Sequence, residues 1–338
     1  MDGDVAFRDA IRLANGFRGY QLVVAACRLN LPDLIADAPR DVDDLAAATA
    51  THAPSLRRAL RGLAAWGFFT EDDQGRFAAT PVSEMFRSDR PGLRNLTVML
   101  SDEGYRAWGE MLHTLRTGEP VFERIYGKSH WEKLAEDPEA AAEFNAAMVE
   151  MTTRVTGEFV AAYDFQGVRT VVDVGGGSGA LLAAVLKAHP DLSGVLFDLA
   201  AGLAGAPAAL ASAGLTTRVR LVEGSFFESV PAGGDLYMLK SIIHDWDGEH
   251  AGSILKTCRD AMGADARLVL IERVVPERAD DGDDVLRTLM SDLHMMVVLG
   301  GRERTTGEYQ ELFAAAGLRM TRQVAMASEF YAVEAKRA

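Results

Sequence analysis

The sequence has few cysteines and no long apolar run. Its two cysteines, Cys27 and Cys258, lie far apart and neither belongs to a C-x-x-C pair, which excludes a disulfide framework and a cysteine-based zinc site. No apolar segment approaches the roughly 20 residues that a transmembrane helix needs. The opening residues, Met1-Asp2-Gly3-Asp4, lack the positive charge of a signal peptide. We therefore expect a cytoplasmic protein with reduced thiols and no membrane partner.

Positive charge is also scarce in this sequence. Lysine and arginine number 35 against 49 aspartates and glutamates, which gives a net charge of -14 at pH 7. Such a surface repels phosphate backbones and anionic lipid headgroups, so nucleic acid is not expected as the main partner. No group of metal-ligating residues has a suitable spacing either, and we expect no metal ion.

The chain is long enough for an enzyme core and a smaller domain. It has 338 residues, of which 48% are hydrophobic and 25% are charged. This composition is typical of globular proteins, and the length corresponds to about two domains.

Residues 1–100 are predicted to form helices and one short hairpin. A first helix is expected within 5–26, a second after the acidic residues at 41–44, and a third from 54 to 66, because their apolar residues follow helical spacing. The segment 68–78 contains two short apolar stretches around a polar turn, which indicates a β-hairpin. Helix, helix and hairpin is the order of a winged helix.

A winged helix allows a DNA-binding interpretation, which Arg57, Arg58 and Arg61 support. Residues 40–90 nevertheless contain seven arginines and eight acidic residues, a local net charge of -1. Nucleic-acid-binding modules are usually strongly basic on the contact face. The sequence therefore favours a packing or dimerisation role for this domain.

Two further parts follow in the sequence. Residues 101–165 are predicted to be a helical bridge that contributes to an acceptor pocket. From 166 to 338, short apolar strands alternate with helices, which predicts a doubly wound, mostly parallel α/β sheet. The expected strands are Thr170–Val174, Gly194–Asp198, Val219–Val222, Leu236–Leu239 and Arg267–Glu272, with a terminal hairpin formed by Arg319–Val324 and Phe330–Glu334.

The most specific segment is a strand that runs into a glycine-rich turn at 175–179. Gly175, Gly177 and Ala180 fit the dinucleotide pattern G-x-G-x-x-G/A. Asp173 precedes the first glycine by two residues, where its charge disfavours a pyrophosphate and favours a cationic amino-acid group. Asp198 ends the next strand, where a carboxylate can bind ribose hydroxyls. S-adenosylmethionine offers both groups, whereas a tight turn without a ligand is the alternative.

A histidine follows the strand that ends near Leu239. His244 is expected at the carboxyl ends of the strands, where ligands bind in open α/β sheets, and a histidine there can act as a general base. Glu272 closes the next strand and Glu303 follows a Gly-Gly-Arg sequence. A carboxylate bonded to the far imidazole nitrogen fixes the tautomer and stabilises the imidazolium. A structural histidine remains the alternative from spacing alone.

These segments resemble the S-adenosylmethionine-dependent small-molecule O-methyltransferases of the plant caffeate type and their bacterial natural-product relatives. The resemblance covers nearly the whole chain. It is carried by the sequences at Val172–Gly179, Phe197–Leu199, Gly224–Phe227, Leu239–Asp247, Ile271–Arg273 and Gly300–Thr305. It implies a class I methyltransferase domain behind a winged-helix dimerisation domain, and a homodimer.

The resemblance also assigns roles to individual residues. It implies that His244 deprotonates the acceptor hydroxyl and that Glu272 and Glu303 flank it. The cofactor site is expected to contain Asp173, Gly175, Gly177, Asp198, Ser225, Phe226 and Lys240. An aromatic acceptor is expected between Phe144, Met148 and Met295, although core packing is an alternative role for these methionines.

The predicted function is methyl transfer from S-adenosylmethionine to a hydroxyl, most simply a phenol, of a small aromatic or polyketide-type natural product. Two alternatives stay open at this point. A member of the family could use the same cofactor site for hydroxylation or pericyclic chemistry, and a winged-helix regulator could sense a small molecule.

Overall fold

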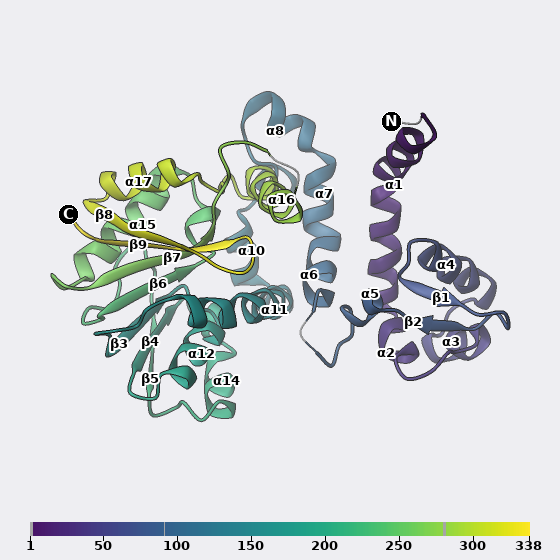
Figure 1. Cartoon of the computed structure of the whole chain (residues 1–338), viewed down its shortest axis with the longest axis horizontal. Coiled ribbons are helices and arrows are strands. Elements are labelled where there is room, and N and C mark those ends of the chain that lie inside the picture. Colours follow the sequence, from purple (N-terminus) through teal and green to yellow (C-terminus); the bar gives the residue numbers. More distant parts are fainter. Residues whose placement is uncertain (1–2, 91, 280–281) are drawn as a thin grey trace. The chain divides into compact units, whose positions relative to one another are not determined.

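The computed structural model describes residues 3–90, 92–279 and 282–338, and the chain divides into two compact units between Asp102 and Glu103 (Figure 1). The expected helical bridge, 101–165, is largely helical, and all of it from Glu103 onward belongs to the second unit. Their contribution to an acceptor pocket stays a prediction. Within the described residues, no helix is both long and apolar enough to cross a membrane.

The first unit is a small helical domain with one β-hairpin. Asp41 caps a helix by accepting a hydrogen bond from the Asp43 amide at 2.8 Å, and Leu45, Leu60 and Phe77 are fully buried between the elements. Its elements are α1 (Gly3–Arg28), α2 (Leu31–Ile35), α3 (Val42–Thr49), α4 (Ala53–Ala65), β1 (Phe69–Glu71), β2 (Phe77–Ala79), α5 (Pro81–Glu84) and α6 (Arg94–Met99). The antiparallel pair β1–β2 is the predicted hairpin.

The second unit begins with a run of helices before its sheet. The π-helical turn η1 (Leu100–Gly104) spans the boundary between the units, and a single long helix, α11, ends this run. The helices are α7 (Tyr105–Gly109), α8 (Met111–Thr117), α9 (Phe122–Tyr126), α10 (His130–Glu136) and α11 (Pro138–Ala162). Asp137 caps α11 by accepting hydrogen bonds from the Glu139 and Ala140 amides.

The sheet of the second unit has seven strands in the order β5-β4-β3-β6-β7-β9-β8. Neighbours from β5 to β7 are parallel, whereas β9 is antiparallel to both β7 and β8. The predicted class, a doubly wound sheet with a terminal antiparallel hairpin, is therefore confirmed. The strands are β3 (Thr170–Val174), β4 (Ser193–Asp198), β5 (Val219–Glu223), β6 (Leu236–Lys240), β7 (Arg267–Arg273), β8 (Leu318–Ala325) and β9 (Phe330–Arg337).

Helices cover both faces of this sheet. The helical segments from Ala180 onward are α12 (Ala180–Ala188), α13 (Ala200–Leu203), α14 (Ala206–Ser212), the 3-10 turn η2 (Ile243–Asp245), α15 (Gly248–Ala261), α16 (Asp283–Val298) and α17 (Thr306–Ala315). Of these, α16 packs mainly against α7 and α8. Figure 1 shows α15 and α17 on the opposite face from α12 and α14. Two separate clusters of buried apolar residues lie on the two faces.

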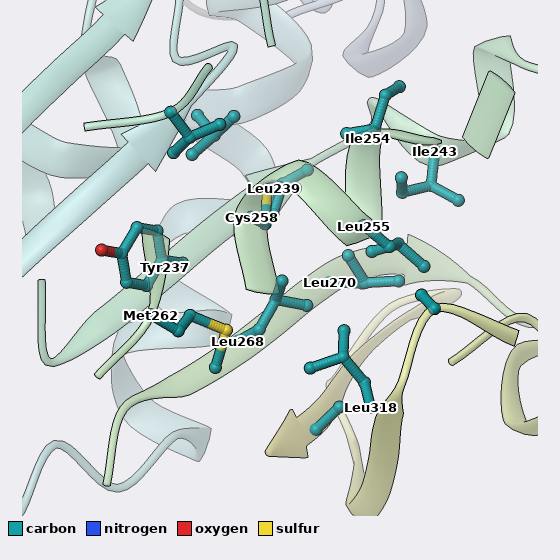
Figure 2. Packing of buried hydrophobic residues seen from close by; sticks show 14 of the residues in the cluster. Tyr237, Leu239, Ile243, Ile254, Leu255, Cys258, Met262, Leu268, Leu270 and Leu318 are labelled. Carbon is teal, nitrogen blue, oxygen red and sulfur yellow. The ribbon is translucent and has the colours of Figure 1, made fainter. Parts of the chain in front are cut away.

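One of these clusters anchors the segment that follows β6. Leu239 and Leu270, from two adjacent strands, pack with Ile254 and Cys258 of α15 (Figure 2). Ile243, the first residue of η2, is fully buried in the same cluster. Burial of a large aliphatic side chain stabilises by about 1.5–3 kcal/mol, so the core holds η2 and the histidine next to it in place. Cys27 and Cys258 are both fully buried.

Candidate active site

Three of the predicted site residues lie at the carboxyl ends of neighbouring strands. Strand β3 lies between β4 and β6. The chain adds β4 and β5 on one side of β3 and then crosses to the other side to add β6 and β7, so the direction of strand addition changes at β3. Ligands in open α/β sheets bind outside the strand ends at such a point. Asp173 lies on β3, Lys240 ends β6, and Glu272 is the second-last residue of β7.

His244 lies among three carboxylates. Its Nδ1 is 2.9 Å from Oε1 of Glu303 and 3.8 Å from Oε2 of Glu272, and its Nε2 is 3.4 Å from Oδ1 of Asp245. His244 is 6% exposed, and both glutamates are buried. Nδ1–H donates to Glu303, which leaves Nε2 as the atom that can exchange a proton with a ligand.

The surrounding carboxylates make His244 unusually basic. Burial lowers its pKa, but the negative charges of Glu303, Glu272 and Asp245 outweigh this effect and raise the pKa from 6.5 to about 9. Burial also raises the pKa of Asp245 to about 7, against the opposing effect of His244. The pKa of Glu303 is lowered despite its burial, because His244 and Arg273 stabilise its charge. The site is therefore built to stabilise an imidazolium.

The backbone around His244 is fixed from two sides. Oε1 of Glu272 accepts hydrogen bonds from the amides of Ile242 at 3.0 Å and Ile243 at 2.9 Å. The Arg304 guanidinium donates to the carbonyls of Ile243 and Trp246, each at 2.9 Å. A rigid backbone on both sides of η2 keeps the imidazole in one orientation, which a positioned base requires.

The loop after α16 approaches η2 so closely that it requires a glycine. The Arg302 amide donates to the His244 carbonyl at 2.8 Å. A Cβ on Gly301 would lie 2.0 Å from the same carbonyl oxygen, and Gly300 has φ of +77°. The Gly-Gly sequence before Glu303 thus lets this glutamate reach the imidazole.

The side chains of His244, Glu272 and Glu303 are also close enough together to be considered as a metal site. Ligand atoms of His244, Glu272 and Glu303 all lie within 4.8 Å of one another. Nδ1 of His244 already donates to Glu303, however, and a metal-ligating nitrogen has to be free of hydrogen. We retain the prediction that the reaction of this site uses no metal.

The glycine turn after β3 leaves open space for a ligand. Gly175 and Gly177 have φ of +70° and +55°, a region that favours glycine. A Cβ on Gly175 would meet Ile242 at 2.5 Å, whereas no atom lies within 4 Å of the position for Gly177. The Gly177 amide donates to Oδ2 of Asp198 at 2.8 Å, which fixes the carboxylate at the end of β4.

Asp173 offers a buried negative charge without a full set of partners. It is 1% exposed, and its Oδ2 has no hydrogen-bond partner. Burial, followed by the charge of Asp198, raises its pKa from 3.8 to about 7. A buried, ionised carboxylate without a partner is strongly stabilised when a cationic ligand binds next to it. The residues therefore fit the ammonium group of an amino-acid-bearing nucleoside.

The other predicted cofactor residues lie around the same turn. Phe226 approaches Gly175, because a Cβ built there would be 3.7 Å from its ring. Ser225 accepts a weak hydrogen bond from the Phe227 amide at 3.3 Å. Burial, and then the charge of Arg273, lower the pKa of Lys240 to about 8. The structure thus brings these residues together with Asp173, although their contacts with a cofactor stay predictions.

The predicted acceptor residues lie on two helices. Phe144 and Met148 are one turn apart on α11 and partly buried, and Met295 of α16 is 9% exposed. The ring of Phe144 packs edge-on against Trp131 with centroids 5.8 Å apart. Trp131 in turn stacks on Trp246 at 6.1 Å. An aromatic chain therefore connects α11 to the residue two positions after His244.

Several residues of this site were not predicted from the sequence. Asp245 and Trp246 were part of a quoted motif but received no role, although they directly follow His244. Arg273 lies 3.7 Å from Oε1 of Glu303, and the Ser291 hydroxyl donates to the same oxygen at 2.7 Å. The contact of Ser291 had no sequence signal, because it depends on how α16 packs.

Two family models match the chain. The model described as an O-methyltransferase domain matches residues 108–319, and the model described as an O-methyltransferase dimerisation domain matches residues 11–89. The chain is 41% identical to the phenazine O-methyltransferase PhzM of Lysobacter antibioticus over 96% of this chain and 95% of that protein. It is 34% identical to a phenazine-1-carboxylate N-methyltransferase of Pseudomonas aeruginosa over 98% of each chain.

The structure also resembles solved structures of an O-methyltransferase from neocarzinostatin biosynthesis. The TM-score is 0.82 at 37% identity, over 94% of this chain and 96% of the other. One of these crystal structures contains S-adenosylhomocysteine and 1,4-dihydroxy-2-naphthoic acid. Another contains S-adenosylmethionine and 2-hydroxy-5-methyl naphthoic acid.

Proposed function

Because the chain belongs to the O-methyltransferase family, we propose that it methylates a hydroxyl of a small aromatic natural product with His244 as the general base. Membership argues against the winged-helix regulator, since both domains match models of methyltransferases. The relatives named as methyltransferases favour methyl transfer over hydroxylation or pericyclic chemistry. The predicted homodimer agrees with the matched dimerisation domain.

S-adenosylmethionine is the methyl donor, as the sequence predicted, and the structures of a 37% identical enzyme contain it and its product. When bound, this cofactor supplies an electrophilic methyl group on a sulfonium. Asp173 would hold its ammonium group, because this buried carboxylate has an unpaired oxygen. Asp198 would accept hydrogen bonds from its ribose hydroxyls. The open space beside Gly177 would allow the cofactor to lie close to the backbone of the glycine turn.

His244 prepares the acceptor for reaction. Its neutral imidazole takes the hydroxyl proton on Nε2, and the imidazolium that forms keeps its Nδ1–H on Glu303. The carboxylates of Glu272 and Glu303 stabilise this positive charge, and the proton stays on the imidazole. Trp131, Phe144 and Trp246 would pack against the acceptor ring, exclude water and orient its oxygen.

The placement of His244 is the observation that carries this proposal. Its Nδ1 lies 2.9 Å from Oε1 of Glu303, which leaves Nε2 for the acceptor proton, and the surrounding carboxylates raise its pKa. A phenol resembles the tyrosine side chain, with a pKa of about 10. Proton transfer to a base with an ordinary pKa of 6.5 is uphill by about 5 kcal/mol. Transfer to His244, whose pKa is raised to about 9, is uphill by much less. The carboxylate cluster therefore brings the pKa of His244 closer to the pKa of a phenolic acceptor.

A test of this assignment compares two alanine variants. His244→Ala should retain affinity for S-adenosylhomocysteine and lose about 10²–10⁴-fold in kcat, the usual contribution of a general base. His52→Ala, at an exposed position, serves as the matched control and should keep wild-type turnover. Equal turnover of His244→Ala and wild type would show that His244 is not the base.

The acceptor class can be tested with a panel of small aromatics. Phenols, naphthols and hydroxyphenazines should gain 14 Da in the presence of S-adenosylmethionine, whereas the matched anilines should not. The anilines are included because one relative is named an N-methyltransferase. Methylation restricted to nitrogen acceptors would overturn the proposal of a hydroxyl acceptor.

A further inference from the structure

A second histidine of the acceptor region, His294 on α16, has its tautomer fixed by a tryptophan. The indole Nε1–H of Trp108 on α7 donates to Nδ1 of His294 at 3.0 Å. An indole nitrogen can only donate. Nδ1 of His294 therefore carries no hydrogen, and the neutral ring has its single hydrogen on Nε2.

The ring of His294 is also held neutral. Burial, and then the charges of His130 and His244, lower its pKa from 6.5 to about 4. At neutral pH the side chain is thus an uncharged donor with one N–H group. No side chain or backbone atom of the described residues accepts this N–H, and the residue is only partly buried.

The position of His294 on its helix places it on the face that meets the catalytic group. Ser291 of the same helix donates to Oε1 of Glu303 at 2.7 Å, and Glu303 accepts from His244. Residues three and four positions apart share one face of a helix. His294 is three positions after Ser291, and Met295, a predicted acceptor residue, is four positions after it.

We propose that His294 donates its Nε2–H to an uncharged carbonyl oxygen of the acceptor, next to the hydroxyl that is methylated. This proposal rests on the proposed function and makes ortho- or peri-hydroxy carbonyl aromatics, such as ketones, esters or quinones, the preferred acceptors. A neutral imidazole offers a hydrogen bond but no compensating charge. The neutral imidazole therefore suits an uncharged carbonyl better than a carboxylate, which would also lie near the carboxylates of Glu272 and Glu303.

The chemistry of such acceptors explains what this donor does for the reaction. In an ortho-hydroxy ketone, the hydroxyl proton is bound internally to the carbonyl oxygen. A hydrogen bond from His294 to that oxygen competes with the internal bond and releases the hydroxyl proton toward Nε2 of His244. His294 is in this sense a specificity-determining residue, because it acts on one class of phenol only.

The experiment measures binding to the enzyme saturated with S-adenosylhomocysteine, which needs no turnover. The probes are 1-hydroxy-2-acetonaphthone, which has the adjacent carbonyl, 1-naphthol, which lacks it, and 1-hydroxy-2-naphthoate, which has a charged group instead. Wild type should bind the ketone more tightly than either of the others. In His294→Phe the ratio of ketone to naphthol affinity should fall about tenfold or more, because a buried carbonyl then lacks its donor.

Three further variants distinguish this role from simple packing. His294→Gln retains an N–H donor and should restore part of the ratio. Trp108→Phe removes the bond that fixes the tautomer and should lower the ratio less than His294→Phe does. His130→Phe changes a neighbouring imidazole whose Nδ1 also lacks a partner, and it should leave the ratio near that of wild type.

The outcomes separate this inference from the proposed function. An unchanged ratio in His294→Phe, or a loss in His130→Phe instead, would overturn the role of His294 while leaving methyl transfer intact. Failure of the wild-type enzyme to methylate any phenol would overturn the proposed function, and the affinity ratio would still decide the role of His294. The ratio of kcat/KM for the ketone and 1-naphthol should follow the affinity ratio across all variants.

Discussion

His244 has to be neutral to take a proton, yet the carboxylates of Glu303, Glu272 and Asp245 hold its pKa at about 9. Below this pKa the imidazole is protonated, and its neutral fraction grows about tenfold with each pH unit. We therefore expect kcat/KM to rise about tenfold per unit between about pH 6 and 8 and to level near pH 9. A pH profile measured with a phenol whose own pKa exceeds about 10 checks this. A profile that levels near pH 6.5 would contradict the raised pKa.

Neutralising one of the carboxylates should move that profile. Glu303→Gln removes the charge that raises the pKa of His244 most among its neighbours, while its amide oxygen can still accept from Ser291. The pH at which kcat/KM levels should fall toward the ordinary value for histidine, and the plateau rate should also fall. Glu311→Gln, at an exposed position of α17, is the control and should keep the wild-type profile. An unshifted profile in Glu303→Gln would show that this carboxylate does not set the pKa.

Asp173 should make cofactor binding depend on pH in the neutral range. Burial and Asp198 raise its pKa to about 7, so it is mostly protonated below that value and mostly ionised above it. An ionised carboxylate attracts the cofactor ammonium. The affinity for S-adenosylhomocysteine, measured by calorimetry, should therefore weaken up to about tenfold from pH 8 to pH 6.

Two substitutions check the origin of this dependence. Asp173→Asn cannot ionise, and it should bind S-adenosylhomocysteine weakly at both pH values. Asp191→Asn alters an exposed carboxylate and should retain the wild-type dependence. Equal affinities of wild type at both pH values would mean that Asp173 does not bind the ammonium.

The sequence predicted the residues at the strand ends better than those on the helices. Glu272 and Asp198 could be placed because they lie at the ends of apolar strands, and His244 because it follows one within a few residues. Parallel strands bring their carboxyl ends to one edge of the sheet. Trp108 and His294 are 186 positions apart in the chain. Their hydrogen bond depends on how α7 and α16 pack together, which no local pattern specifies.

At the scale of elements, the connection between α16 and α17 places Glu303 against η2. Gly301→Ala would put a Cβ 2.0 Å from the His244 carbonyl oxygen, so the loop and η2 have to separate. We expect kcat to fall about tenfold or more, because a general base acts only from within hydrogen-bond reach, and the melting temperature should fall as well.

A second glycine provides the matched control for this loop. Gly157 is exposed on α11, and nothing lies within 4 Å of an added Cβ there. Gly157→Ala should therefore keep wild-type kcat and stabilise the fold by about 0.5–1 kcal/mol, since alanine is the better helix former. Wild-type kcat in Gly301→Ala would contradict the positioning role of this loop.

Strands could be predicted from the sequence more closely than the helices before them. The first strand, Thr170–Val174, was predicted with the bounds that the structure has, because a buried parallel strand is a short apolar run between turn residues. The segment 101–165 was predicted only as helical. Its division into α7 to α11 follows from caps such as Ser129 and Asp137, which were not used as signals.

At the scale of the whole molecule, the composition argued against classes of partner but did not identify the cofactor. The net charge of -14 argued against nucleic acid, and the matched dimerisation domain now gives the first unit another role. The charge could not indicate the cofactor, which depends on Asp173 and Asp198 alone. The three-part division with a separate bridge stays a prediction, because the structure divides the chain into two units.

The long helix α1 should supply part of the interface of the homodimer. Its apolar side chains Leu13 and Phe17 are 86% and 52% exposed within one chain, and they lie one helical turn apart. Apolar surface removed from water stabilises an interface by about 25 cal/mol per Å². The double variant Leu13→Glu/Phe17→Glu should therefore sediment as a monomer at concentrations where wild type is a dimer. Leu221→Glu, on the edge strand β5 of the other unit and 38% exposed, should remain dimeric. A dimeric double variant would exclude this face of α1 from the interface.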